Sequence, residues 1–227
     1  MDISLHHAGL NLQISILESR QFAERERAHR HLKSRFDWRN YSSPTLTPMP
    51  DRTTIVVEQH TKPKLRGSIT VNIDGAFGLP LDRLVRGELD DLRTRGGSLF
   101  QISKLAADSA DESKAMVGAL MSCAFLFGAE VEACQTVVVE VNPRHTAFYR
   151  RVMGFRTFAA PALDPKVNAP AHFLAADAPA LIKRLLRIHC ERTTGFKASF
   201  FSAEQAEHFV SAIRLHRSAG VPGLFAA

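Results

Sequence analysis

Residues 137–155 read VVVEVNPRHTAFYRRVMGF, and this stretch decides the fold class. A β-branched run ends in Asn142 and Pro143, a helical stretch follows, and Gly154 with Phe155 closes the segment. Asn is a preferred N-cap and Pro is favoured at the first helical position, so the sequence predicts a strand that leads directly into a helix. Glycine adopts turn conformations at low steric cost, so Gly154 permits a tight turn off that helix.

Outward from this stretch, hydrophobic periodicity predicts alternating strands and helices. The expected strands are residues 10–17, 54–59, 67–73, 98–106, 136–141, a strand from 155, and 171–176. The expected helices are residues 19–36, 81–92, 109–128, 143–153, 178–192 and 203–217. This order predicts an α/β fold, a mixed central sheet with helices on both faces and extra C-terminal helices. We expect one domain over residues 1–200, followed by a C-terminal helix and tail over residues 201–227.

The composition is that of an ordinary globular protein, with 45% hydrophobic and 23% charged residues. The longest apolar stretch, residues 115–129, falls short of the roughly 20 residues that a membrane span needs, so no stable membrane insertion is expected. The N-terminal sequence MDISLHHAGL has no basic cluster and no apolar run, so it predicts no secretory signal. The three cysteines lack CxxC spacing, which favours reduced thiols in a cytoplasm and predicts no metal site.

The net charge of +6 allows two kinds of partner. Lys and Arg are dispersed along the chain, and neither RNP-type aromatics nor a Cys/His finger spacing is present. A dispersed positive charge suits an acidic protein partner or an anionic substrate, and no nucleic-acid partner is expected. A basic nucleic-acid-binding or interaction module stays an alternative, supported best by Lys183, Arg184 and Arg187 on one predicted helix.

Residues 137–155 resemble the strand-and-helix signature of GNAT acyltransferases, in which an Asn follows the strand and a Tyr precedes Gly-Phe. The resemblance implies that the strand splays from its neighbour so that pantetheine can lie between the two. Asn142 would offer a donor and an acceptor to the pantetheine amides. Tyr149 would protonate the departing thiolate. The simpler alternative is that Asn142 only caps the helix and that Phe148 and Tyr149 only pack on the core.

Four ordered segments carry a narrower resemblance. They are HLKSRFDWRNY at 31–41, FGLPLDRLVRGELDDLR at 77–93, FQISKLAAD at 100–108 and VEVNPRHTAFYRRVMGF at 139–155. Together they resemble long-chain N-acyl amino acid synthases, GNAT-like relatives of the acyl-homoserine lactone synthases. This resemblance implies transfer of a fatty acyl chain from acyl carrier protein to the α-amine of an amino acid. Gln101 stands where the family has Glu, which leaves the general base to be found elsewhere.

The connection at 106–118, AADSADESKAMVG, bears on the acyl donor. GNAT enzymes that use acetyl-CoA cradle its pyrophosphate in a glycine-rich loop at this place. Here no glycine precedes Gly118, and Asp108, Asp111 and Glu112 are expected to repel phosphate. We therefore expect an acyl carrier protein thioester as donor and no permanently bound cofactor. An acyl-CoA-dependent small-molecule N-acetyltransferase is the alternative.

An α-amine is mostly protonated at neutral pH and must lose a proton before it attacks. Glu140 is the candidate base, because a carboxylate within an apolar strand is costly unless paired, although alternation also allows it to face outward. Gln101, at the position of the family's carboxylate, is the other candidate catalytic group on the strands. Backbone N–H groups near Ile102 and Ser103 are expected to hold the oxyanion. Tyr149 completes the set as the general acid.

The acceptor's carboxylate needs a cation. The candidate substrate-binding residues are Arg39, Lys104, Arg144 and His145. Each of these could instead be an ordinary surface side chain. The apolar helix at 115–127, with Leu79 and Leu84, is a candidate floor for an acyl tunnel, with core packing as the alternative. Any membrane association is expected to be peripheral, through the lipid product.

Overall fold

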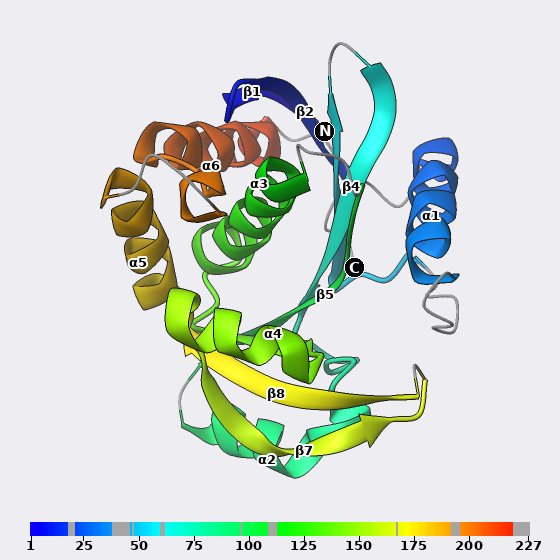
Figure 1. The fold of residues 1–227 in the computed structure, drawn as a ribbon, viewed down its shortest axis with the longest axis vertical. Coiled ribbons are helices and arrows are strands. Elements are labelled where there is room, and N and C mark those ends of the chain that lie inside the picture. The colour runs from blue at the N-terminus through cyan, green and yellow to red at the C-terminus, as the bar shows by residue number, and fades with distance from the viewer. Residues whose placement is uncertain are drawn as a thin grey trace.

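The structure is a computed structural model that describes residues 1–17, 21–37, 46, 48–59, 62–95, 97–108, 113–166, 168–191 and 196–219. A single sheet of eight strands runs through it in the order β1-β2-β3-β4-β5-β6-β8-β7 (Figure 1). The strands are β1 (Asp2–His7), β2 (Leu10–Leu17), β3 (Arg52–Gln59), β4 (Lys62–Ile73), β5 (Leu99–Ala107), β6 (Thr136–Val141), β7 (Arg156–Asp164) and β8 (Ala169–Asp177). The pair β5–β6 is parallel and the other neighbouring pairs are antiparallel, so the sheet is mixed as predicted.

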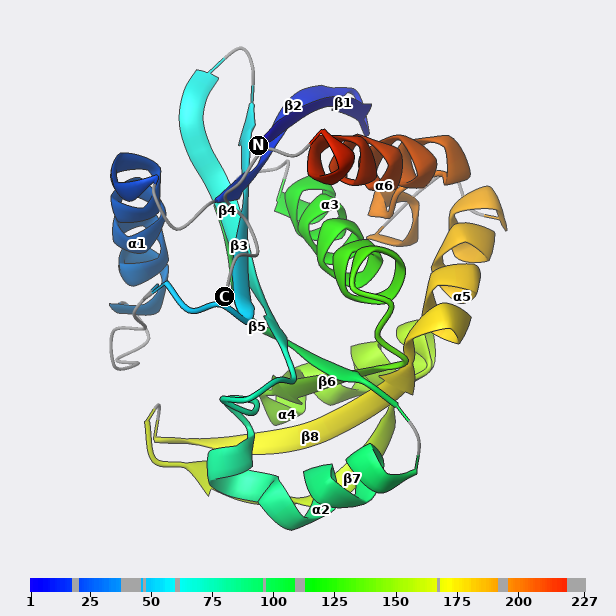
Figure 2. The ribbon, with the colours of Figure 1, turned by 180° about the vertical axis from the view of Figure 1, so that it is seen from behind.

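Helices cover both faces of the sheet (Figures 1 and 2). One face carries α1 (Phe22–Asp37) and α2 (Asp82–Thr94). The other carries α3 (Ser113–Leu126), the π-helix η1 (Phe127–Val131), α4 (Pro143–Phe148), the π-helix η2 (Tyr149–Met153), α5 (Ala178–Glu191), the 3-10 helix η3 (Phe196–Ser199) and α6 (Ala203–Ser218). We call these the α2 face and the α3 face. The predicted α/β class with helices on both sides is confirmed.

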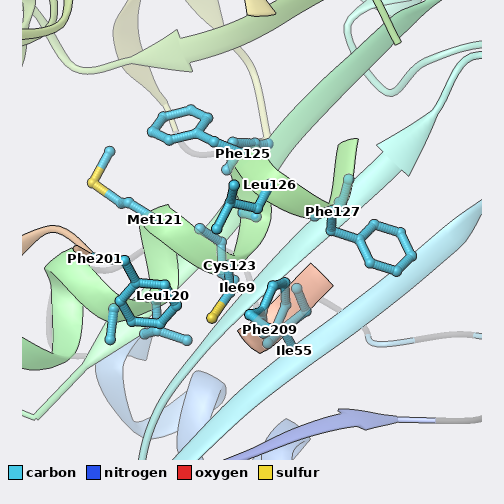
Figure 3. Close-up of a cluster of buried hydrophobic side chains, with 14 of the residues drawn as sticks. Ile55, Ile69, Leu120, Met121, Cys123, Phe125, Leu126, Phe127, Phe201 and Phe209 are labelled. Atoms are coloured by element: carbon cyan, nitrogen blue, oxygen red, sulfur yellow. The ribbon is translucent and has the colours of Figure 1, made fainter. Parts of the chain in front are cut away.

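The largest hydrophobic cluster fills the α3 face (Figure 3). Ile55 and Ile69 from the sheet, Phe125 and Phe127 from the α3–η1 helix and Phe209 from α6 are all fully buried there. Because α3 is apolar almost all round, it must be surrounded by protein, as the sequence predicted. Full burial of a side chain of this size contributes about 1.5–3 kcal/mol, so this cluster supplies much of the stability.

The apolar helix continues past residue 128, where the sequence predicted its end. Helices α3 and η1 together form a run of 19 residues, Ser113–Val131, which by length and composition alone could cross a membrane. Two thirds of its apolar window (67%) is buried inside the fold, as in the core helix of a soluble protein. The apolar stretch at 115–129 lies within this helix, and burial in the core accounts for its composition.

The C-terminal segments pack directly on the main core. Phe209 and Ile213 of α6 belong to the hydrophobic cluster of the α3 face. At Gly118 of α3, an added Cβ would lie 1.9 Å from the carbonyl oxygen of Ser199 in η3, so only glycine allows this close approach. The Ser122 hydroxyl accepts a hydrogen bond of 3.0 Å from the backbone N–H of Phe201. The division of the chain at residue 200 stays a prediction.

Most predicted elements are present, with shifted ends. The strands expected at 54–59 and 67–73 are present as the antiparallel pair β3 and β4, but β4 begins at residue 62 rather than 67. The strand β1 was not predicted; it is a short edge strand whose buried residues alternate with exposed ones. The expected start of the helix at residue 109 lies outside the described residues.

Candidate functional site

The two parallel strands separate near the middle of the sheet. Their pairing runs from Leu99–Thr136 to Ile102–Val139, whereas β5 continues to Ala107 and β6 to Val141. We call the point just past Ile102 and Val139 the fork. The backbone of β5 is irregular directly after it, because its register against β4 shifts there and Lys104 has a φ of 53°, which non-glycine residues seldom adopt. The strands therefore diverge in the manner that the GNAT resemblance implied.

Glu140 is the first residue of β6 past the fork. Side chains alternate along a strand, so Glu140 shares the α2 face with Val138, which belongs to the hydrophobic cluster that includes Val85 and Leu89 of α2. The Nη2 atom of Arg83 on α2 donates to Glu140 Oε2 at 3.3 Å. Burial, followed by the neighbouring carboxylate of Asp164, raises the pKa of Glu140 to about 7. A carboxylate with such a pKa can accept a proton near neutral pH.

The fork is polar on the β5 side too. The Asn72 side-chain amide on β4 donates to the Ser103 hydroxyl at 3.0 Å and to the backbone carbonyl of Gln101 at 3.2 Å. The Nε atom of Arg52 on β3 in turn donates to Asn72 Oδ1 at 3.0 Å. Ser103, the first residue of β5 past the fork, is thus held in place by side chains from two further strands.

Lys104 follows in a positively charged setting. Burial, and then the charges of Arg52, Lys166 and Arg25, lower the pKa of Lys104 to about 8. These three cations come from β3, from the turn between β7 and β8, and from α1. Lys166 also acts electrostatically on Glu140, so the cations and the carboxylate belong to one region of the α2 face. An anionic group on a ligand would be attracted here.

Gln101 plays a structural part in the α2 face. Its side chain is 2% exposed, and its Oε1 accepts a hydrogen bond of 3.0 Å from the backbone N–H of Leu81, directly before α2. This contact holds the start of α2 against β5. A catalytic role for Gln101 stays a prediction, and the contact gives the side chain a task that requires no chemistry.

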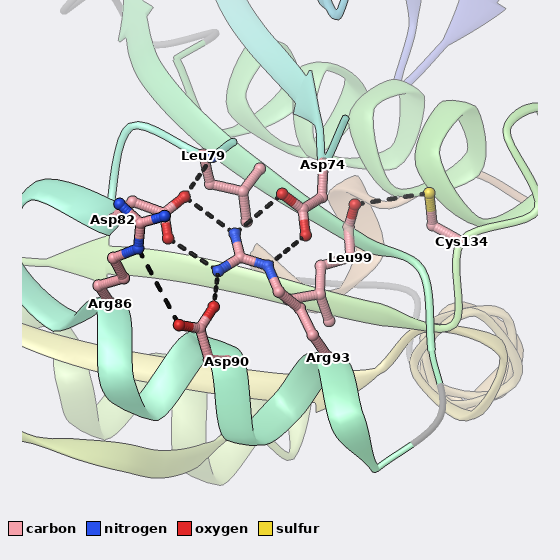
Figure 4. Close-up of polar contacts among 8 residues, drawn as sticks. All are labelled: Asp74, Leu79, Asp82, Arg86, Asp90, Arg93, Leu99 and Cys134. Atoms are coloured by element: carbon pink, nitrogen blue, oxygen red, sulfur yellow. Dashed lines mark hydrogen bonds and ion pairs between the residues drawn. The ribbon is translucent and has the colours of Figure 1, made fainter. Parts of the chain in front are cut away.

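Helix α2 is fixed further by Arg93, which lies between three carboxylates (Figure 4). Its guanidinium donates to Asp74 at 2.7 and 2.9 Å, to Asp82 at 2.8 and 2.9 Å, and to Asp90 at 2.7 Å. The hydrogen bond from Arg93 is the largest cause that lowers the pKa of Asp82. Asp74 directly follows β4, so this network ties α2 to the sheet and positions Arg83 over Glu140.

Tyr149 belongs to the α3 face. It begins the π-helix η2, and its ring packs edge-on against Phe148 and Phe155, with centroids 5.7 and 5.4 Å away. Burial raises the pKa of the Tyr149 hydroxyl to about 12, so the phenol stays protonated at neutral pH. Among the described residues no hydrogen-bond partner of this hydroxyl is found. π-Helical turns are frequent at functional sites, and here one places a protonated phenol on the face opposite Glu140.

The other predicted residues in the described part of the chain make contacts that do not involve Glu140. Asn142 caps α4, because its Oδ1 accepts a hydrogen bond of 3.2 Å from the backbone N–H of Arg144. Arg144 and His145 are exposed in the first turn of α4, on the α3 face, where Arg144 Nε donates to His145 Nε2 at 3.0 Å. Arg39 lies outside the described residues. The structure therefore places Ile102, Ser103, Lys104 and Glu140 around the fork, and Arg144 and His145 elsewhere.

Two expectations about charge need correction. Asp108 at the end of β5 was expected to repel phosphate, but its carboxylate contacts His31 at 3.1 Å, Arg66 at 3.4 Å, and Arg35. Two arginines therefore offset its charge, and His31 adds a further contact. Residues 109–112 lie outside the described residues. The basic face of α5 is partly structural too, because Arg184 donates to the backbone carbonyls of residues 151 and 152 at 3.1 and 2.7 Å.

Sequence reasoning missed Arg83, Asp164, Arg52 and Asn72. Arg83 looked like one of several charges on the polar side of a helix, and Asp164 like an ordinary turn residue. Their contact joins residues 81 positions apart in the chain, and no short motif carries that information. The only available signal was Glu140 itself, because a carboxylate in an apolar strand calls for partners.

The sequence model of the family "N-acyl amino acid synthase FeeM" matches residues 27–177. The solved structure of FeeM, an N-acyl amino acid synthase from uncultured soil microbes, is similar with a TM-score of 0.67 and 25% identity, covering 81% of this chain and 95% of FeeM. The CoA-dependent acyl-homoserine lactone synthase BjaI has a TM-score of 0.55 and 12% identity, covering 89% of this chain and 98% of BjaI.

An acyl-CoA N-acyltransferase from Pseudomonas aeruginosa has a TM-score of 0.53 and 14% identity, covering 72% of this chain and 98% of that protein. At these lower identities the last two similarities show the fold alone. No curated protein matches the chain in sequence. The resemblance read from four sequence segments and the GNAT-like fold class are both confirmed. The chain belongs to the FeeM family of N-acyl amino acid synthases and is an acyltransferase with a GNAT-like fold.

Proposed function

We propose that this enzyme transfers a long-chain fatty acyl group from acyl carrier protein to the α-amine of an amino acid. The observation that carries the proposal is the fork, with the partly buried carboxylate Glu140 on one face and the protonated phenol of Tyr149 on the other. Acyl transfer to an amine needs a base on the acceptor side and an acid on the leaving-group side. The acceptor would approach from the α2 face and the thioester from the α3 face.

In the proposed reaction, Glu140 takes a proton from the acceptor's ammonium group. The free amine attacks the thioester carbonyl carbon, and a backbone N–H of β5 at Ile102 or Ser103, where its pairing with β6 ends, stabilises the oxyanion. The intermediate collapses by breaking the C–S bond, and Tyr149 donates its proton to the thiolate. The phenolate then regains a proton from the nitrogen of the new amide. The products are the amide, the free thiol and one proton that Glu140 returns to solvent.

Lys104 is the proposed partner of the acceptor's carboxylate. It lies one residue past Ser103 and is surrounded by the charges of Arg52, Lys166 and Arg25. An amino acid could then bind with its carboxylate at these cations and its amine at Glu140. Such two-point binding would favour amino acids over simple amines.

For the donor we favour acyl carrier protein over acyl-CoA. The chain has no glycine-rich pyrophosphate loop at 106–118, and its net charge of +6 would attract an acidic carrier protein. Acyl-CoA is the second candidate, because the cations around Asp108 remove part of the expected repulsion of phosphate. We further propose a cytoplasmic enzyme, in keeping with the free thiols of Cys123, Cys134 and Cys190, that releases a lipid able to enter membranes.

The test is an assay of the purified full chain with a fatty acyl carrier protein or the matching acyl-CoA, supplied with each amino acid in turn. Mass spectrometry would identify the N-acyl amino acid formed. We expect turnover with the carrier protein to exceed turnover with acyl-CoA by at least tenfold. Equal rates with both donors would overturn the donor assignment, and acylation of simple amines but of no amino acid would overturn the acceptor class.

A further inference from the structure

Three charged side chains meet on the α2 face just past the fork, and they come from three separate elements. Arg83 of α2 donates to both carboxylate oxygens of Asp164, at the end of β7, at 2.6 and 2.7 Å. The same guanidinium reaches Glu140 of β6 at the longer distance of 3.3 Å. Asp164 is buried, whereas Glu140 and Arg83 are partly exposed: their side chains are exposed by 4% (Asp164), 20% (Glu140) and 26% (Arg83).

The sharing of Arg83 is unequal, and this has a consequence for Glu140. Two short, parallel hydrogen bonds to one carboxylate are the strongest arrangement that an arginine makes. Asp164 is held in that arrangement from its other side too, because its Oδ1 accepts a hydrogen bond of 2.9 Å from the backbone N–H of Lys166. Most of the positive charge of Arg83 is therefore offset by Asp164, and Glu140 keeps one longer contact with Arg83. Glu140 also interacts with the Asp164 carboxylate, which raises the pKa of Glu140.

A strong ion pair would make Glu140 a poor base, because a fully paired carboxylate holds its negative charge too firmly to take a proton. A Glu140 with no cation nearby would have the opposite defect and would stay protonated at neutral pH. The charged groups that face it are Arg83 from α2, Asp164 from β7 and Lys166 from the turn after β7. Their balance leaves Glu140 between these extremes.

We propose that Asp164 and Arg83 are positioning residues that hold Glu140 in this weakly paired state, in which it can take and release the acceptor's proton at neutral pH. This inference rests on the proposed role of Glu140 as the base. It assigns a task to two residues that touch neither the acceptor nor the thioester in the proposed reaction. It also explains why a bidentate ion pair lies beside the fork.

The test compares Asp164→Asn with Arg83→Gln in the full-length enzyme, by the pH dependence of kcat at saturating acceptor. Asp164→Asn removes a repelling carboxylate and frees Arg83 for Glu140, so the acidic limb of the profile should move to lower pH by at least one unit. Arg83→Gln removes the attracting cation, so the limb should move to higher pH by a similar amount. A ¹³C NMR titration of the Glu140 carboxylate should show the same two shifts.

Matched controls are Asp177→Asn and Arg86→Gln. Asp177 is exposed before α5, and Arg86 is an exposed residue of α2 that lies 4.0 Å from Asp90. In both variants the acidic limb of the pH profile of kcat should stay at the wild-type pH. Arg83→Lys, which preserves the charge, should restore the limb that Arg83→Gln moves. If Asp164→Asn does not fold, the test is the comparison of Arg83→Gln with Arg83→Lys. An acidic limb at the same pH in these two variants rejects the inference.

Opposite shifts in the two principal variants support the inference, whereas unmoved limbs, or limbs that move in the same direction, overturn it. A failure of the proposed function looks different. If Glu140→Gln keeps the wild-type limb and turnover, Glu140 is not the base and the inference falls with it. If Glu140→Gln removes the limb while Asp164→Asn and Arg83→Gln leave it in place, the base role stands and only the inference is rejected.

Discussion

The side chain of Gln101 on β5 accepts a hydrogen bond of 3.0 Å from the backbone N–H of Leu81, in the turn that opens α2. This bond lies in the interior, since Gln101 is 2% exposed and Leu81 is fully buried. It sets the position of α2, and with it Arg83, relative to the fork. The residue that replaces the family's carboxylate therefore has a clear structural effect.

Replacement of Gln101 by Leu should lower the free energy of unfolding by about 1–3 kcal/mol, because the N–H of Leu81 would be left buried without a partner. Urea unfolding measures this difference. The control is Gln135→Leu, at an exposed glutamine, where a change within about 0.5 kcal/mol is expected. A stable Gln101→Leu enzyme with little activity would instead point to a chemical role for Gln101.

A pair of glycine substitutions tests the packing of the C-terminal segments on α3. In Gly118→Ala the new Cβ would lie 1.9 Å from the carbonyl oxygen of Ser199, so η3 must move and stability should fall by about 1–3 kcal/mol or more. Gly87 is an exposed residue of α2, and nothing lies within 4 Å of a Cβ added there. Gly87→Ala should therefore raise the free energy of unfolding by roughly 0.5–1 kcal/mol. Thermal unfolding of both variants checks these signs. Equal midpoints would contradict the close approach of α3 and η3.

Local sequence patterns predicted those parts of the molecule whose structure depends on neighbours along the chain. The run TVVVEV is β-branched and apolar, and it forms β6; the helix at 115–128 is apolar all round, and it forms the buried α3–η1 helix. The edge strand β1 was not predicted, because its six residues give too short a hydrophobic pattern to identify a strand. Exact ends were missed where tertiary pairing extends a strand, as at the start of β4.

The candidate site was predictable only in part, for a physical reason. Tyr149 and Asn142 lie within one short segment, so a motif could identify them. The environment of Glu140 depends on Arg83 and Asp164, which approach it only when α2 folds over β6 and β7. The positive backbone φ of Lys104 likewise results from the shifted register between β4 and β5, which no local spacing encodes.

Lys104→Met should separate binding from chemistry. If Lys104 holds the acceptor's carboxylate, KM for the amino acid should rise roughly 10- to 100-fold, because a hydrogen bond between two charged groups contributes about 1.5–3 kcal/mol. For the matching amine, which differs from the amino acid only by lacking the carboxylate, KM should change little. The control is Lys183→Met, on the exposed face of α5 and far from the fork in sequence. A KM change of equal size for amino acid and amine would reject the assignment.

The raised pKa of Glu140 also affects stability. Because its pKa is about 7 when folded against an ordinary 4.5, the folded state binds the proton more tightly, and this contribution is present below pH 4.5 and lost as pH rises through 7. Glu140→Gln does not titrate, so it should gain stability relative to the wild type between pH 4.5 and 8, by on the order of 1–3 kcal/mol. Urea unfolding across this range measures the gain. A difference that is constant with pH would show that Glu140 is not desolvated in the folded protein.

Tyr149→Phe removes one hydroxyl and leaves the edge-on contacts with Phe148 and Phe155 in place. Because no partner of that hydroxyl is found among the described residues, the free energy of unfolding should change by less than about 0.5 kcal/mol. Turnover on the natural donor should fall roughly 10²- to 10⁴-fold if the phenol protonates the thiolate. The loss should shrink for thioesters of more acidic thiols, since a better leaving group needs less protonation. Normal turnover would remove Tyr149 from the mechanism, and a large loss of stability would show that the hydroxyl has a buried partner instead.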